Sequence, residues 1–217
     1  MGDKPILFSG PMIRALLDGR KTMTRRVLKP AFQYMLKDQH DRWDSFSEEH
    51  WQRLYAGTFE DGTRCIQSLP YAPGDRLWCR EAFSYSWAVK DDPEARHLMP
   101  CWYWADGDHP TYGDWAKPKP SIHMPRWASR LTLTVTAVKV ERLQDITGMD
   151  AMREGVSIPA HIPQDGADLD CARREFKSLW TSIHGPGAWE ANPWVAAITF
   201  TVERRNIDTP TPEQREG

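Results

Sequence analysis

The chain has 217 residues, of which 40% are hydrophobic and 27% charged, and its net charge at pH 7 is -2. This composition allows one packed domain with insertions, and it excludes a protein that binds nucleic acid through global basicity. No apolar run approaches the ~20 residues of a membrane helix, and the first residues lack the apolar stretch of a secretory signal. We therefore expect a cytoplasmic protein without a membrane partner.

The N-terminal region predicts a short strand at residues 4–8 followed by a short helix. Ser9 can cap this helix, Pro11 suits its first turn, and apolar residues recur at helical spacing up to position 17. Gly19 is a typical residue for the left-handed end of a helix. A strand and a helix of about two turns should therefore precede the next segment.

Residues 19–26 read Gly-Arg-Lys-Thr-Met-Thr-Arg-Arg, with four cations, two hydroxyls and no carboxylate. Neighbouring positive charges disfavour the protonated form of a lysine, and arginines suit an electron-rich ligand. The helix dipole explains part of the pattern, because cations are favoured beyond a helix C-terminus. This segment is the first candidate for a functional site, with Lys21, Thr24 and Arg26 as its candidate side chains.

Residues 76–83 predict a strand after a turn at 70–75, whereas residues 31–70 sustain no period beyond a possible helix around 47–55. In this strand Glu81 shares one face with Leu77, Cys79 and Phe83. A carboxylate on an apolar face has a raised pKa or a buried cationic partner, for which Arg25, Arg26 and Arg80 are the candidates.

The rest of the chain alternates loops, strands and short helices. Residues 84–125 are rich in tryptophan and proline and predict an ordered insertion. We expect strands at 131–141 and 193–203 and helices from Thr147 to Gly155 and from 170 to 183. The inward residues of the second helix should be Phe176, Leu179, Trp180 and Ile183, and one face of the last strand should hold Trp194, Ala196, Ile198, Phe200 and Val202. These elements predict an α+β fold, a small mixed β-barrel flanked by short helices with long Trp-rich loop insertions.

Two segments resemble the ASCH domain family of the PUA-like superfamily. Gly19, Lys21, Thr24 and Arg26 form the pattern Gly-x-Lys-x-x-Thr-x-Arg, which is similar to the first signature of that family. Residues 73–83, Pro-Gly-Asp-Arg-Leu-Trp-Cys-Arg-Glu-Ala-Phe, look like its second signature. The resemblance implies a PUA-like β-barrel.

Two further segments, residues 121–130 and 192–195, are similar to a longer subgroup of that family found in phages and prophages. The resemblance covers most of residues 4–204. It implies one domain over residues 1–205, with insertions at 31–70 and 84–125, and a flexible tail at 206–217.

The resemblance also implies an activity. Some small bacterial members of the family are amidohydrolases that remove the acyl group of N(4)-acetylcytidine, and their working residues match Lys21, Thr24 and Glu81 here. Thr24 would be the nucleophile or hold the attacking water, Lys21 would be the base, and Glu81 would shuttle a proton to the exocyclic nitrogen. No cofactor and no metal are expected, since no ligand spacing suggests one.

Arg26, Arg126, Trp78 and His123 are the candidates for substrate binding. Arg26 and Arg126 could steady the developing negative charge. Trp78 lies in a patterned strand and also suits a core position. His123 stands near serines but has no acidic partner nearby in sequence, so it also suits a loop histidine without a catalytic role.

Two functions therefore stay open. The first is a metal-independent amidohydrolase acting on an N(4)-acylated cytidine or a related modified nucleobase. The second is a module that binds RNA or a modified base without turnover, with a ribonuclease as a weaker version. Loop tryptophans 102, 104, 115 and 127 lie beside basic residues, which suits base stacking, but a small core for the insertion explains them equally well.

Overall fold

The computed structural model describes residues 2–28, 33–34, 54–58, 64–86, 101–108, 115–157 and 167–209. Its strands are β1 (Asp3–Leu7), β2 (Met23–Val27), β3 (Gln33–Tyr34), β4 (Leu54–Thr58), β5 (Arg64–Ser68), β6 (Arg76–Arg80), β7 (Phe83–Tyr85), β8 (Cys101–Tyr103), β9 (Thr132–Arg142) and β10 (Trp194–Glu203). The α-helices are α1 (Gly10–Leu17), α3 (Gly148–Arg153) and α4 (Ala167–His184). Short 3-10 helices are η4 (Trp104–Asp106), η5 (Ser121–His123), η6 (Arg126–Ala128) and η7 (Leu143–Asp145). Within the described ranges, none of the helices combines the length and the apolar character needed to span a bilayer.

The central sheet has five strands in the order β1-β6-β9-β10-β2. Strand β1 runs parallel to β6, and the other pairs of neighbours are antiparallel. Two smaller sheets contain β3-β5-β4 and β7-β8. The predicted mixed α+β class is therefore confirmed. The predicted small mixed PUA-like β-barrel is not confirmed, because β1 and β2 form open edges of the sheet in the described part of the chain.

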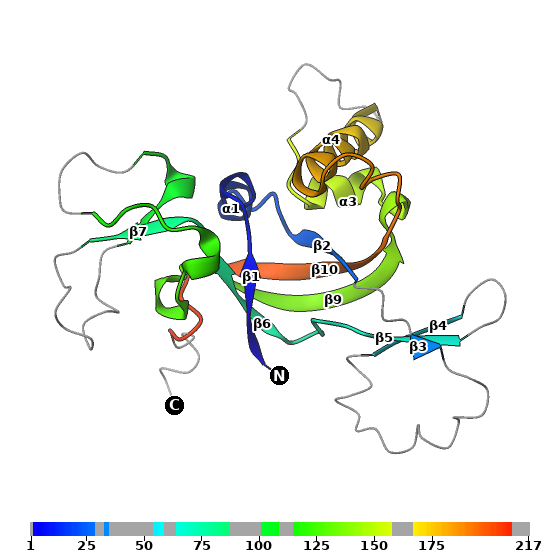
Figure 1. Cartoon of the computed structure of the whole chain (residues 1–217), viewed down its shortest axis with the longest axis horizontal. Helices are drawn as coiled ribbons and strands as arrows, with labels where there is room; N and C mark the ends of the chain where they lie inside the picture. Colours follow the sequence, from blue (N-terminus) through cyan, green and yellow to red (C-terminus); the bar gives the residue numbers. More distant parts are fainter. Residues whose placement is uncertain are drawn as a thin grey trace.

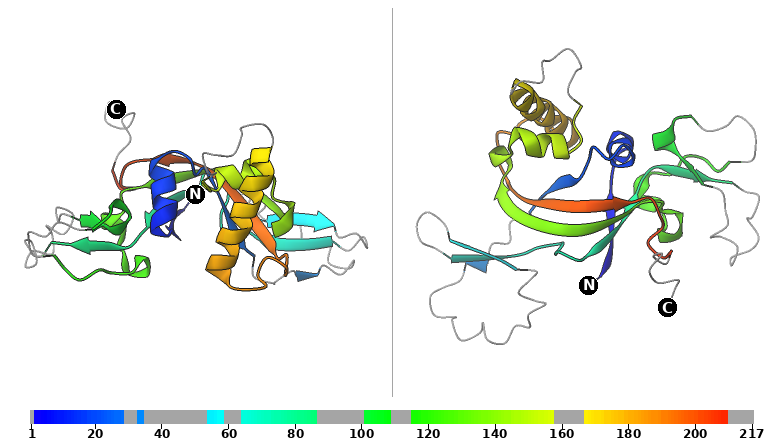
Figure 2. Two further views of the ribbon diagram at one scale, coloured as in Figure 1. Left: turned by 90° about the horizontal axis from the view of Figure 1, so that it is seen from above. Right: turned by 180° about the vertical axis from the view of Figure 1, so that it is seen from behind.

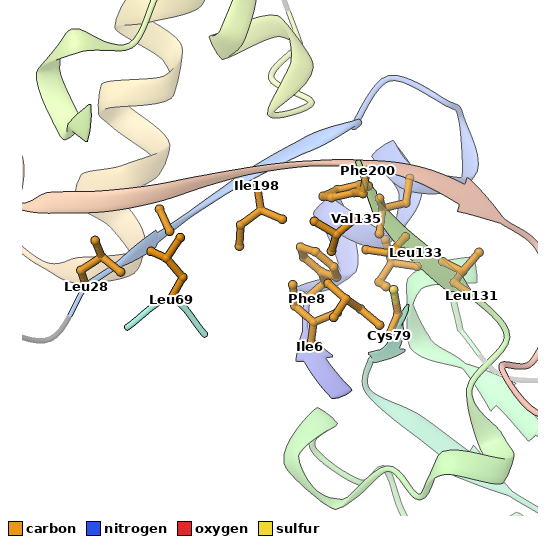
Figure 3. Close-up of a cluster of buried hydrophobic side chains, with 14 of the residues drawn as sticks. Ile6, Phe8, Leu28, Leu69, Cys79, Leu131, Leu133, Val135, Ile198 and Phe200 are labelled. Carbon is orange, nitrogen blue, oxygen red and sulfur yellow. The ribbon is translucent and has the colours of Figure 1, made fainter. Parts of the chain in front are cut away.

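The main core lies inside the curve of this sheet, under α1. Figure 3 shows Phe8, which follows β1, beside Ile6 of β1 and Val135 and Leu133 of β9. The opposite face of β10 is covered by α3 and α4, which lie over one end of β9 and β10 (Figures 1 and 2). There a second core joins α4 to Val195. The first half of β10, residues 195–198, is therefore buried on both faces, as its continuous apolar run requires.

The predicted alternation of inner and outer side chains is confirmed in the last strand, β10. Ala196, Ile198 and Phe200 lie in the main core, and Trp194 and Val202 pack against it. The face with Glu81 is buried as expected, but the predicted strand 76–83 is interrupted after Arg80, and β7 pairs with β8 instead. The helix suggested around 47–55 lies largely outside the described residues, and its last two positions begin β4.

The helices agree with their capping signals. Gly19 has a φ of 73° just after α1, and the Thr147 side chain accepts a hydrogen bond from the Asp150 amide at 3.1 Å at the start of α3. Phe176 and Trp180 of α4 face the second core, but Ile183 is 50% exposed, which corrects its predicted inward position. In the last turn of α4 it is the His184 ring that packs beside Trp180, with ring centres 4.1 Å apart.

The segment after β10 is held by the protein over its first residues. Ile207 is buried, its carbonyl accepts from Arg76, and the Asn206 side chain donates to three carbonyls in residues 126–129. The remainder of the tail predicted at 206–217, residues 210–217, lies outside the described residues. So do most of the predicted insertion 31–70 and residues 87–100 and 109–114 of the insertion 84–125.

Candidate active site

Side chains bridge the two edge strands β1 and β2. Arg26 donates from Nη2 to the Leu7 carbonyl at 2.7 Å, and its guanidinium carbon lies 5.3 Å from the centre of the Phe8 ring. The Lys21 amine lies 5.6 Å from the centre of the same ring. We call the region formed by Phe8, Lys21, Thr24 and Arg26 the seam, because it joins the open edges of the sheet through cations and an aromatic ring.

A turn after α1 brings Lys21 to the seam. The Gly19 amide donates to the Leu16 carbonyl at 3.1 Å, and the Lys21 amide donates to the Ala15 carbonyl at 3.0 Å. The positive φ of Gly19 suits this reversal, since only glycine adopts it without a steric cost. The turn therefore lies at residues 18–19, before Lys21, and Lys21 itself forms a β-bridge with Glu154 ahead of strand β2. The hypothesis of a shared site for Lys21 and Thr24 requires a turn after Gly19, and the observed turn ends there.

Lys21 is completely buried, and its amine makes three hydrogen bonds. Nζ donates to the Met23 carbonyl and the Glu154 carbonyl, both at 2.9 Å, and to Glu154 Oε2 at 2.8 Å. An ammonium group has three N–H donors, so all three are used. The burial of this charge is thus compensated by one carboxylate and two carbonyls.

Arg25 points to the other side of β2, toward the helices. Its guanidinium donates to Glu141 Oε1 at 3.0 and 2.6 Å and to Glu154 Oε1 at 3.2 Å, and it lies 5.9 Å from the centre of the Phe176 ring. Asp150 of α3 accepts a longer bond of 3.4 Å. The carboxylates missing from the basic segment in sequence are therefore supplied by β9 and by the region of α3. The role of Arg25 is to join these elements to β2.

Thr24 faces the interior beside the seam. Its residue partner on β10 is Ile198, a member of the main core, and its side chain is almost fully buried. Because alternate residues of a strand share a face, Thr24 and Arg26 point to the same side. The hydroxyl is thus placed on the inner face of the sheet, on the same side of β2 as Arg26.

Glu81 lies on the strand next to Phe8. The last register pair of β1 and β6 is Leu7 with Arg80, and the Phe8 amide donates to the Arg80 carbonyl at 3.0 Å. One step further along, Phe8 and Glu81 are both buried, so they lie on the same face of the sheet. Phe8 therefore has the seam cations on one side and Glu81 as its neighbour across the strands.

The Glu81 carboxylate is held by Arg130. Arg130 donates from Nε to Oε1 at 2.9 Å and from Nη2 to Oε2 at 3.0 Å, and its other edge makes two bonds of 2.7 Å to Asp106 of η4. The Tyr103 ring lies 4.0 Å from the guanidinium carbon. The predicted partner of Glu81 was wrong: it is Arg130, not Arg25, Arg26 or Arg80, because the β6–β9 pairing places the start of β9 opposite the end of β6.

The pKa values of Lys21 and Glu81 shift in opposite directions. Burial lowers the pKa of Lys21, and Arg26 and Arg25 lower it further, while Glu154 opposes them. Burial raises the pKa of Glu81, and Arg130 opposes that shift. Both pKa values thus shift in the direction that favours a neutral amine and a neutral carboxyl group, the forms that a general base and a general acid need.

The other predicted binding residues lie elsewhere. Arg126 pairs on the surface with Asp208, at 3.0 Å from Nε, and with Asp3. Trp78 lies on the face of β6 opposite Cys79, with the Arg80 guanidinium 5.3 Å from its ring centre, and His123 is exposed in η5. Of the four candidates, the structure brings only Arg26 to the seam.

Three residues at the site were not predicted from the sequence. Glu154 had a weak signal, since it stands directly before the predicted helix stop Gly155. Arg130 is the last residue of segment 121–130, which resembles the longer ASCH subgroup. No pattern in that segment indicates that Arg130 pairs with Glu81. Phe8 fits a strand core and gave no sign of contact with two cations.

Among the described residues, no group of three or more His, Cys, Asp and Glu side chains is arranged to hold a metal ion. No protein-family model, curated protein or solved structure matches the chain. The ASCH resemblance of the two signature segments therefore stays a prediction.

Proposed function

We propose that the protein is a metal-independent amidohydrolase that removes an acyl group from an N(4)-acylated cytidine or a related modified nucleobase. The observation that carries the proposal is the geometry around Phe8: the buried Lys21 amine lies 5.6 Å from the centre of its ring, and the buried Glu81 lies on the neighbouring strand. The pKa of Lys21 is lowered and the pKa of Glu81 is raised, in keeping with this burial. Each shift is caused mainly by burial, which is how enzymes bring such groups toward neutral pH.

The proposed chemistry assigns one task to each side chain. Lys21 in its neutral form takes a proton from Thr24 or from a water held by Thr24, and the resulting oxygen attacks the acyl carbon. Arg26 stabilises the negative oxygen that develops. Glu81 in its protonated form gives a proton to the exocyclic nitrogen as the C–N bond breaks. When the nucleophile is water, the products are the cytosine amine and the carboxylic acid. When Thr24 attacks, the cytosine amine leaves first and an acyl-Thr24 ester remains, and a water that Lys21 deprotonates then hydrolyses the ester to the carboxylic acid and free Thr24.

The fold forms part of the same proposal. A five-stranded sheet curled around one core, with side chains bridging its two edges, supports assignment to the PUA-like barrels. The proposed substrate is a modified nucleoside or the same base within RNA, and the proposed location is the cytoplasm.

A second function is favoured by one surface feature. Trp102 and Trp115 of the insertion lie edge to face with ring centres 6.5 Å apart, and Lys117 is exposed beside Trp115. Aromatic rings next to a cation suit stacking on single-stranded bases. An RNA- or modified-base-binding module without turnover, or a ribonuclease, is therefore the alternative.

The test is incubation with N(4)-acetylcytidine while the ultraviolet band of the substrate is followed. We expect conversion to cytidine by the wild type, and a loss of about 100-fold or more in Lys21→Met and Glu81→Gln, the range for general acid–base groups. Asp106→Asn is the matched control, because it removes the other carboxylate of Arg130 without touching Glu81.

The proposal fails if the folded wild type converts no acylated cytidine. Binding to single-stranded RNA that weakens steeply with salt would then favour the alternative, because salt dependence reports phosphate contacts.

A further inference from the structure

Glu154 makes the closest contacts to Lys21 and has no role in the chemistry described above. It follows α3, 133 positions from Lys21, and binds the amine twice, through its carbonyl at 2.9 Å and its carboxylate at 2.8 Å. The two residues also form an isolated antiparallel bridge. Both side chains are buried, with 0% and 4% of their surfaces exposed.

The position of Glu154 is fixed from three directions. Its second carboxylate oxygen accepts from Arg25 Nη1 at 3.2 Å, and the Thr22 amide donates to the Arg153 carbonyl at 2.8 Å. Gly155 follows with a φ of 88°, and a Cβ there would lie 2.9 Å from Lys21 Cβ. The backbone after α3 is thus packed directly against Lys21, so the carboxylate has little freedom to leave the amine.

Only one of the three groups that accept from the Lys21 amine is ionisable. The Met23 and Glu154 carbonyls are neutral, whereas the Glu154 carboxylate carries a charge that favours the ammonium form. The cations that face the amine, Arg25 and Arg26 of β2, act in the opposite sense. Glu141 of β9 and Asp150 of α3 contact Arg25, so they reach Lys21 only through it.

We propose that Glu154 is a positioning residue that holds the Lys21 amine in the seam and sets its protonation state. The inference rests on the proposed function of Lys21 as the base. It accounts for the burial of a carboxylate on the helix side of β2. It also makes the region after α3 part of the site, although none of the signature segments includes it.

The experiment compares Glu154→Gln with Glu141→Gln. Both remove one buried negative charge that contacts Arg25, but only the first touches Lys21. Without the Glu154 carboxylate, the pKa of Lys21 falls further, so the neutral amine persists at lower pH. The acidic limb of kcat/KM for N(4)-acetylcytidine should therefore move to lower pH by about one unit or more in Glu154→Gln. It should stay in place in Glu141→Gln.

NMR titration of the lysine side-chain signals in the same variants separates this inference from the proposed function. If the wild type is inactive but Glu154→Gln still lowers the titration midpoint of the Lys21 amine, the proposed deacylase activity is overturned. The role of Glu154 in catalysis is then overturned with it. If the wild type is active, and both variants shift the acidic limb of kcat/KM and the titration midpoint of Lys21 equally, only the inference about Glu154 is overturned. Should Glu154→Gln fail to fold, Glu154→Asp withdraws the carboxylate by one carbon and should move the limb the same way by less; no movement overturns the inference.

Discussion

Lys21 and Glu81 are both buried charges compensated by distant residues, but their surroundings differ. The partner of Lys21, Glu154, is itself buried with 4% of its side chain exposed. The partner of Glu81, Arg130, has 22% of its side chain exposed and shares its guanidinium with Asp106. One ion pair is thus sealed within the protein, and the other reaches the surface.

This difference affects how much each pair contributes to stability and which group exchanges its proton directly with the solvent. A sealed pair loses most when one member is removed, because the remaining charge cannot be solvated. A pair open to solvent can be relieved by water or by a proton. The Lys21 side of the site should therefore dominate stability, and the Glu81 side should exchange protons with the solvent.

The largest expected effect is on the sealed pair. Lys21→Met leaves the Glu154 carboxylate buried with Arg25 alone, and we expect a loss of about 3 kcal/mol or more in the free energy of unfolding. Arg130→Met leaves Glu81 able to take up a proton, and we expect a smaller loss of about 1–3 kcal/mol. Urea denaturation of both variants measures the two losses. Equal losses would remove the distinction between the two pairs.

The next effect concerns the backbone beside Lys21. Gly155→Ala would place a Cβ 2.8 Å from Ala15 Cβ and 2.9 Å from Lys21 Cβ, at a φ of 88°. Gly185→Ala is the matched control, because Gly185 has a φ of 93° and open space around it. The control should cost about 1–2 kcal/mol from backbone strain alone. Gly155→Ala should cost more in the same denaturation experiment, and an equal cost would mean that the contact with Lys21 is loose.

The pH dependence of stability should differ between the two sides. The pKa of Glu81 is raised in the folded state, so its contribution to stability is full below the unfolded pKa and is lost as pH rises through the folded pKa. The pKa of Lys21 is lowered, so its contribution is present above the unfolded pKa and is lost as pH falls through the folded pKa. Glu81→Gln should therefore flatten the stability curve between the unfolded and the folded pKa of Glu81, by about 1.4 kcal/mol per unit of pKa shift. Lys21→Met should change the slope of the stability curve only on the alkaline side. Thermal unfolding across pH checks both, and matching curves for the two variants would contradict the assignment.

The smallest effect is expected at Arg126. Its ion pairs with Asp3 and Asp208 are exposed, so Arg126→Ala should change the free energy of unfolding by at most about 1 kcal/mol. If the seam is the site, KM for N(4)-acetylcytidine should stay unchanged. A marked rise of KM would instead support the prediction from the sequence that Arg126 binds substrate.

Local periodicity was enough to predict the inner side chains of the strands. Alternation placed Glu81 on an apolar face, and the spacing of Ala196, Ile198 and Phe200 predicted one face of β10. These predictions succeed because the side-chain direction in a strand depends only on neighbouring residues. The end of α1 at Gly19 follows from an equally local rule.

Partners that are distant in sequence could not be predicted in the same way. Arg130 meets Glu81 through the register of β6 against β9, and Glu154 meets Lys21 because α3 packs against β2. Neither register nor helix packing leaves a periodic signal in one segment. The sequence therefore predicts the buried position of Glu81 but not those of Arg25, Glu141 and Glu154, and only the tertiary structure identifies which charges compensate one another.

The most direct test of the site is a crystal structure of the protein with cytidine, the product of the proposed reaction. The account predicts the base in the seam against Phe8, with its exocyclic amine beside Glu81 and Thr24 within hydrogen-bonding reach. Cytidine stacked on Trp102 and Trp115, with the seam unchanged, would contradict it.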